Sequence, residues 1–101
     1  LAACKSETKI PENVLQKEEM TSVLVDVHLL EAKVLQLNLS TDSTTKVYSI
    51  LEKQLFEKHN TDSLQYAESM KFYAREPELF HDIYEIVVDT LMIRERSKKI
   101  D

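Results

Sequence analysis

Two ionisable side chains on successive turns of one expected helix, His28 and Glu31, are the first candidates for chemistry in this sequence. Glu31 falls inside the apolar arc of that helix. The arc consists there of Leu24, Val27 and Val34. Because burying an unpaired carboxylate is costly, Glu31 must find a partner or reach water. One hypothesis is a buried polar pair in which Glu31, beside His28, binds a cation or acts as a base.

The alternative role for Glu31 is structural, and we favour it. In this interpretation the carboxylate accepts a hydrogen bond from a tyrosine hydroxyl and thereby fixes the register of two helices. The candidate donors are Tyr48, Tyr73 and Tyr84.

The other two histidines give weaker signals. His81 and Glu85 lie four residues apart, a spacing that can place two metal ligands on one helix face. They fall at the polar edge of their helix, where a solvated ion pair is the commoner outcome, so we expect no metal site. His59 lies beside an expected helix end, where a histidine interacts favourably with the helix dipole. Because no serine, histidine and carboxylate set stands out, we predict no catalytic residue and no cofactor.

The single cysteine, Cys4, follows Leu1, Ala2 and Ala3 and precedes a polar stretch. This pattern resembles a bacterial lipobox, in which a signal peptidase cuts before the cysteine and the thiol carries a diacylglycerol. Several acyl chains anchor a protein stably, whereas one binds only marginally. We therefore expect Cys4 to be the lipidated residue that holds the protein on a membrane. The alternative is a stray cysteine in a frayed terminus.

Composition excludes several function classes. The chain has no glycine, which removes phosphate-binding loops, the nucleophile elbow and the dinucleotide fingerprint. One cysteine excludes an internal disulfide and multi-cysteine zinc sites. With 18 acidic against 13 basic residues, the net charge of −5 disfavours binding to nucleic acid.

Two phenylalanines do not fit the expected inner faces of their helices. Phe56 falls outside the apolar stripe of its helix, and Phe72 projects nearly opposite to Met70 and Tyr66. One hypothesis is that Phe56 and Phe72 form a binding patch for a partner protein. The alternative, which we slightly favour, is that each packs beneath a loop or beneath the N-terminal segment.

Apolar residues spaced by three and four predict helices throughout, so we expect an all-α fold, a small three- to four-helix bundle with an extended N-terminal tether. Asn60 is expected to end the second helix in a left-handed conformation, and Asp62 with Gln65 to cap the third. Pro77 begins the fourth. The expected divisions are 1–16 for the lipobox remnant and flexible tether, 17–96 for the helical domain and 97–101 for a polar tail.

The sequence resembles a family of small Bacteroidetes lipoproteins that carry a helical domain of unknown function. The resemblance rests on the segments "MTSVLVDVHLLEA", "LFEKHN" and "YAESMKFYAREPELFHDIYEIV". The matching positions are Asp26, His28, Phe56, Ser69, Phe72, Tyr73, Pro77, Ile83, Tyr84 and the Ile86-Val87-Val88 run. The resemblance implies a helical fold, a lipid anchor and a cell-envelope location, with no activity attached.

These observations predict a lipid-anchored interaction or assembly module at the bacterial cell envelope, on the outer membrane. The expected partners are the membrane, through the lipid on Cys4, and an envelope protein. The alternative function is an envelope hydrolase or metal-binding protein that uses a buried pair of Glu31 and His28.

Overall fold

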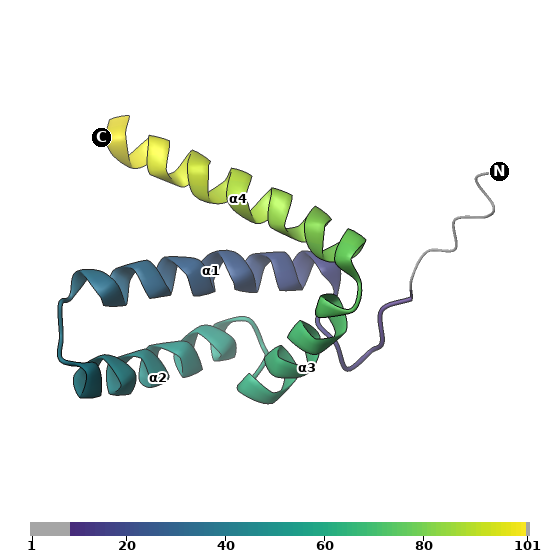
Figure 1. The fold of residues 1–101 in the computed structure, drawn as a ribbon, viewed down its shortest axis with the longest axis horizontal. Coiled ribbons are helices and arrows are strands. Elements are labelled where there is room, and N and C mark those ends of the chain that lie inside the picture. Colours follow the sequence, from purple (N-terminus) through teal and green to yellow (C-terminus); the bar gives the residue numbers. More distant parts are fainter. Residues whose placement is uncertain (1–8, 101) are drawn as a thin grey trace.

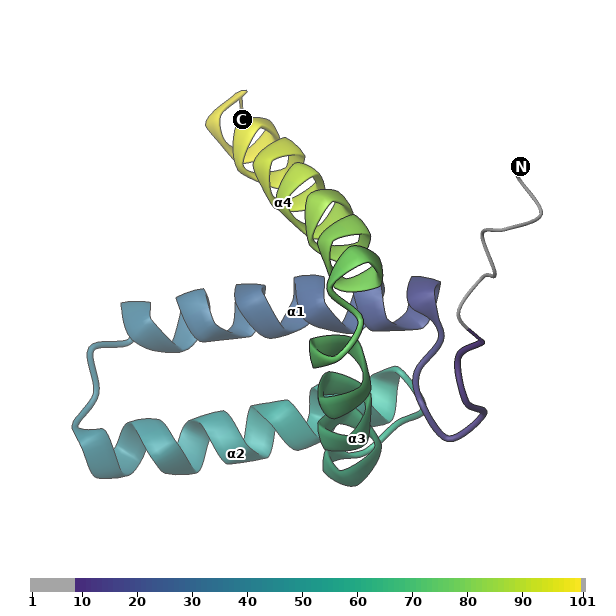
Figure 2. The ribbon, with the colours of Figure 1, turned by 45° about the vertical axis from the view of Figure 1, so that its right-hand side comes forward.

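The structure, a computed structural model, describes residues 9–100, with side chains described as far as residue 97. It contains four helices: α1 (Lys17–Gln36), α2 (Thr41–Lys58), α3 (Ser63–Ala74) and α4 (Pro77–Ile100). No strand occurs between residues 9 and 100, so the predicted all-α fold is confirmed. α1 and α2 form an antiparallel pair, the short α3 crosses one end of that pair, and α4 leans away from α1 (Figure 1; Figure 2).

The helix ends follow local signals in the sequence. Asn38 and Asn60 adopt φ values of 54° and 57°, because a chain without glycine uses asparagine where the backbone turns left-handed. Asp62 caps α3, and its carboxylate accepts a hydrogen bond from the Gln65 backbone N–H at 2.8 Å. The Gln65 side-chain oxygen accepts from the Thr61 hydroxyl and not from the Asp62 backbone N–H, and its Nε2 donates to the Asn13 carbonyl at 3.2 Å. The predicted ends at Asn60 and Asp62 are therefore confirmed, with half of the capping box formed.

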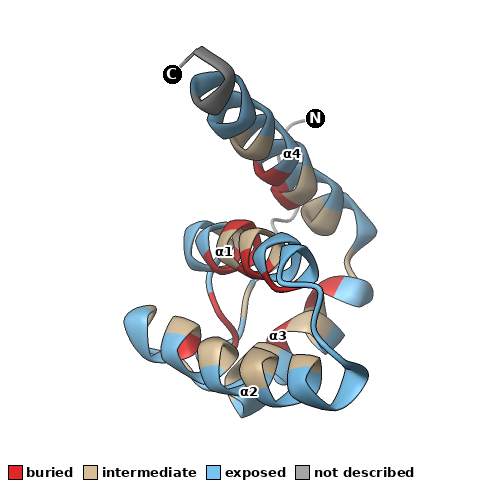
Figure 3. Cartoon of the chain, turned by 90° about the vertical axis from the view of Figure 1, so that its left-hand side faces the viewer, coloured by how far each residue is buried: buried red, intermediate tan, exposed pale blue. Residues whose placement is uncertain are grey.

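The core is centred on α1, which packs against both α2 and α4. The apolar residues spaced by three and four along α1 form its inner face and are all buried: Met20, Val23, Leu24, Val27, Leu30 and Val34. Val25 is buried as well, although it lies on the other side of the helix, because α4 covers that side. Buried residues accordingly gather on α1 and on the surfaces that face it (Figure 3).

The segment 10–16 packs on the domain, which differs from the flexible tether predicted for this part of 1–16. Val14 and Leu15 are buried in the core. The Leu15 N–H donates to the Ser69 hydroxyl at 2.8 Å, and the Tyr73 hydroxyl donates to the Leu15 carbonyl at 2.7 Å. Since these bonds fasten the backbone of residue 15 to α3, the folded domain begins before residue 17.

α4 is longer than the sequence predicted. It begins at Pro77, as expected, because proline suits the first turn of a helix. It continues to Ile100, so the segment 97–100, assigned to a polar tail, is helical. Ile83 and Val87 are buried against α1, but every described side chain from Met92 to Ser97 is exposed. The second half of α4 therefore extends beyond the core.

Candidate functional site

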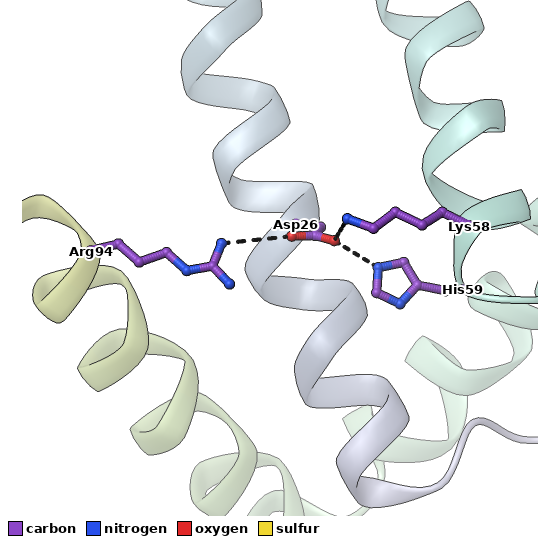
Figure 4. Close-up of polar contacts among 4 residues, drawn as sticks. All are labelled: Asp26, Lys58, His59 and Arg94. Atoms are coloured by element: carbon purple, nitrogen blue, oxygen red, sulfur yellow. Dashed lines mark hydrogen bonds and ion pairs between the residues drawn. The ribbon is translucent and has the colours of Figure 1, made fainter. Parts of the chain in front are cut away.

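The carboxylate of Asp26 is the most heavily contacted charged group in the described part of the chain. Its Oδ2 lies 2.7 Å from His59 Nε2 and 3.3 Å from Lys58 Nζ, and its Oδ1 lies 3.9 Å from Arg94 Nη1. Asp26 comes from α1, Lys58 and His59 from the end of α2, and Arg94 from α4 (Figure 4). One carboxylate thus links three helices.

Local structure explains why these groups meet. Asp26 lies between the buried residues Val25 and Val27, so its side chain is held at the edge of the core and is only 19% exposed. His59 is the C-cap of α2, and its backbone N–H bonds to carbonyls of the last turn of that helix. Lys58 precedes it in the last turn. The end of α2 therefore delivers two basic side chains to one point on α1.

Electrostatics favour the ionised form of Asp26. Burial acts to raise its pKa, but hydrogen bonds from His59 and Lys58, together with their positive charges, outweigh burial and hold the pKa of Asp26 below its usual value. Because an ionised carboxylate only accepts hydrogen bonds, the Nε2 atom of His59 carries the hydrogen that it shares with Asp26.

The geometry identifies the Asp26 cluster as a structural link. An aspartate–histidine pair becomes catalytic when the second ring nitrogen of the histidine contacts a nucleophile. Among residues 9–97, the side chain of His59 is hydrogen-bonded to Asp26 alone. No group of three or more potential metal ligands occurs in the same part of the chain. The cluster holds α1, α2 and α4 together.

The prediction that Glu31 and His28 form a buried polar pair is wrong. The two side chains do meet, with His28 Nδ1 3.3 Å from Glu31 Oε1, but they are 38% and 51% exposed. The predicted bond from a tyrosine hydroxyl to Glu31 is also absent from the described residues, and Tyr73 instead bonds to Leu15. The Glu31 and His28 side chains both stay in contact with water, so Glu31 needs no buried partner.

Glu31 still acts on the tyrosines around it through its charge. Burial, followed by the charges of Tyr84, Tyr48, Glu31 and Glu52, raises the pKa of Tyr66 to about 12. Burial and then the charge of Glu31 also raise the pKa of Tyr84, whose ring meets the edge of His28. Because their pKa values are raised, Tyr66 and Tyr84 are neutral at physiological pH.

The proposed phenylalanine patch is also corrected by the structure. Phe56 is 2% exposed and lies 5.0 Å, between ring centroids, from Tyr66 of α3. Phe56 belongs to the core because α3 crosses the end of α2 and covers the face of α2 that the sequence pattern indicated as outer. Phe72 is half-buried and packs against Tyr73 at 5.1 Å. Phe56 therefore cannot form an exposed patch with Phe72.

The remaining candidates are either solvated or outside the described residues. His81 Nε2 lies 3.1 Å from Glu85 Oε1, and both side chains are largely exposed, which is the solvated ion pair expected from the sequence. Cys4, the predicted lipidation site, lies outside the described residues. No described helix is both long and apolar enough to span a bilayer.

Sequence reasoning missed the central position of Asp26. The signal was present, because a single acidic residue interrupts a run of four aliphatic residues at Val23, Leu24, Val25 and Val27. An acidic side chain at such a position requires a basic partner. A lysine and a histidine at the end of the next helix were available to supply it.

Comparison with known proteins identifies the family. Residues 11–97 match the family described as Domain of unknown function (DUF4296). The chain belongs to the DUF4296 family. The matched region begins at Pro11, so it includes the segment around Leu15 that packs on α3. No curated protein and no solved structure matches the chain.

Proposed function

We propose that this DUF4296 protein is a lipid-anchored interaction module at the bacterial cell envelope, and that it contacts an envelope protein through the turn between α1 and α2. The observation that carries the proposal is a group of three exposed leucines at that turn. We call Leu35, Leu37 and Leu39 the leucine turn.

The leucine turn exposes more apolar surface than an isolated surface leucine. Leu35 is 77% exposed, Leu37 54% and Leu39 41%, and all three lie within five residues. The left-handed Asn38 reverses the chain between them, so they sit on one protruding corner. Grouped exposed apolar residues indicate a contact surface, whereas scattered ones need no explanation.

The position of the leucine turn suits a protein held at its N-terminus. The packed segment 9–16 lies at one end of α1, and the leucine turn lies at the opposite end (Figure 1). The 20 residues of α1 separate the two by about 30 Å. Anchoring near residue 9 would leave the leucine turn free to point away from the anchored end.

The proposed anchor rests on the Leu-Ala-Ala-Cys sequence and on the family resemblance drawn from the motifs above. Because residues from Ile10 onward pack on the domain, the link between Cys4 and the domain is shorter than a tether of 16 residues. The six residue-to-residue steps from Cys4 to Ile10 span about 20 Å when extended. A lipid on Cys4 would therefore hold the domain close to the headgroups.

The anchor is tested by fractionation of the native protein with its signal peptide present. We expect the wild type to partition with membranes, and Cys4→Ser to be released or left unprocessed. A serine variant that is processed and fractionates like the wild type would contradict the anchor, without bearing on the leucine turn.

The leucine turn is tested by photo-crosslinking in native cells. A crosslinking amino acid at Leu37 should capture one defined envelope protein, and the same group at Glu57, exposed at the far end of α2, is the matched control. Leu35→Ser with Leu39→Ser should reduce the capture at least tenfold, since apolar anchors supply most of a contact's energy. Equal capture from both positions, or adducts with lipid alone, would contradict the proposal.

A further inference from the structure

The second half of α4 carries apolar residues that no described element covers. Ile83, Val87 and Leu91 form the row that packs against the rest of the molecule. A second row, Ile86, Thr90 and Ile93, lies beside it at intervals of four and three. Ile86 is 48% exposed and Ile93 62%. Repetition at these intervals is the pattern of a helix that packs along another helix.

The second row lies beside an open groove. Ile86 and Thr90 line a groove of about 440 Å³ between α4 and α1, with Val25 on its α1 wall. The groove is bounded by Lys17, which pairs with Asp82 at 3.7 Å, and by Arg94, which reaches Asp26. The groove combines the apolar Val25 and Ile86 with polar and charged residues, a mixture that a helix with an apolar stripe and charged flanks can match.

The charges of α4 change sign along its length. The first half carries the acidic residues Glu78, Asp82, Glu85 and Asp89. The second half carries the basic residues Arg94, Arg96, Lys98 and Lys99, with Glu95 as the exception. A helix that is acidic at one end and basic at the other is complementary to an antiparallel copy of itself.

We propose that two copies of this protein associate through an antiparallel pair of α4 helices, related by a two-fold axis near Ile93. In this arrangement Ile93 lies beside the two-fold axis and faces its equivalent, as an isologous interface requires. Asp89 and Arg96 flank the row on the same side of α4 and lie seven residues apart, so each Asp89 faces Arg96 of the second copy. The inference does not depend on the leucine turn or on the lipid anchor.

Two observations favour a second copy as the occupant. Asp89 and Arg96 are both exposed, and neither forms an ion pair within the described residues. The seven-residue spacing of the isoleucines also continues in the sequence to Ile100. A partner of uniform charge would be repelled by one half of α4, whereas a reversed copy matches both halves.

The experiment is sedimentation equilibrium of the full chain carrying Cys4→Ser, which prevents disulfide formation. Over a range of about 1 to 500 μM, the mass should rise from 11.8 kDa toward twice that value. Ile93→Lys should weaken association at least tenfold without unfolding the chain, because Ile93 is exposed. Val88→Lys, on the other side of α4 and also about half exposed, is the matched control and should change affinity less than twofold.

A charge exchange tests the antiparallel arrangement itself. Asp89→Arg and Arg96→Asp should each weaken association about tenfold, and the double variant should restore it, since the pairs re-form with opposite polarity. Circular dichroism checks that each variant keeps its helices. A monomer at every concentration, a dimer indifferent to Ile93→Lys, or a double variant as weak as the single ones would each overturn the proposal.

Discussion

The two ends of this molecule differ in how completely they are packed. At the packed end, residues 10–16, α3 and the beginnings of α1 and α4 converge, and the side chains of Met20, Ser69, Tyr73 and Ile83 are fully buried. At the open end, the leucine turn and the second half of α4 are exposed. Where these four segments meet, the chain builds a packed core, and where the helices diverge it leaves apolar surface for association.

Polar groups follow the same division. In the described residues, every buried side-chain nitrogen or oxygen has a hydrogen-bond partner. The hydroxyls of Ser69 and Tyr73, for example, are both bonded to the backbone of Leu15. At the open end, Glu31 and His28 pair in contact with water. We therefore expect substitutions at the packed end to destabilise the protein and substitutions at the open end to leave its stability unchanged.

The largest expected effect is that of Phe56→Ala. Removing a buried phenylalanine leaves a cavity between α2 and α3, and we expect the free energy of unfolding to fall by about 3–5 kcal/mol in urea titrations. Phe72→Ala is the control and should cost less, because Phe72 is only half-buried. Equal losses would mean that the two ends of α3 are packed to the same degree.

Tyr73→Phe should produce the next largest effect. The substitution keeps the ring but leaves the buried carbonyl of Leu15 without the bond from the hydroxyl, which costs about 1–3 kcal/mol. The measurement is again a urea titration. A loss below about 0.5 kcal/mol would show that residues 10–16 contribute little to the packed end.

Tyr73→Phe should also change how the stability of the protein declines at alkaline pH. Burial, followed by the charges of Glu18 and Glu19, raises the pKa of Tyr73 to about 12. An unfolded tyrosine ionises near pH 10, so its contribution to stability is complete below pH 10 and is lost as pH rises toward about 12. We expect the stability of Tyr73→Phe to decline less steeply than that of the wild type in this range.

Asp26→Asn should have an intermediate effect that depends on pH. Because the pKa of Asp26 is lowered in the folded state, its contribution is present above the unfolded value of about 3.9 and is lost as pH falls through the folded value. At pH 7 we expect Asp26→Asn to lower the free energy of unfolding by about 1–2 kcal/mol, a modest value because the Asp26 cluster is partly open to water. The gap between variant and wild type should close on acidification, and a gap independent of pH would contradict the assigned charge.

Glu31→Gln and Glu31→Ala are expected to have the smallest effects. The side chain is half exposed and pairs only with a half-exposed histidine, so both variants should lie within about 0.5 kcal/mol of the wild type. Urea titrations of both, beside Asp26→Asn on the same helix, measure the contrast directly. If Glu31→Ala alone loses more than about 1 kcal/mol, the open end is more closed than its exposure indicates.

The sequence by itself determined the four helices and most of their ends, although not the end of α4. The three- and four-residue spacing of Met20, Val23, Leu24 and Val27 required a buried helix face, and that face is buried. The absence of glycine left asparagine to make the left-handed turns, and Pro77 fixed the start of α4. These features depend on residues within a few positions of one another, so no knowledge of neighbouring helices was needed.

Only the tertiary structure decided which side chains those helices cover. Periodicity identifies an apolar arc but not the neighbour that covers it or how far that neighbour extends. α3 crosses α2 at Phe56 and buries a residue that the pattern placed outside. Glu31 stays half exposed within its arc, whereas the end of α2 contacts Asp26. Such long-range contacts depend on how whole helices cross. For that reason the local pattern marks Asp26 as unusual but does not reveal which groups contact it.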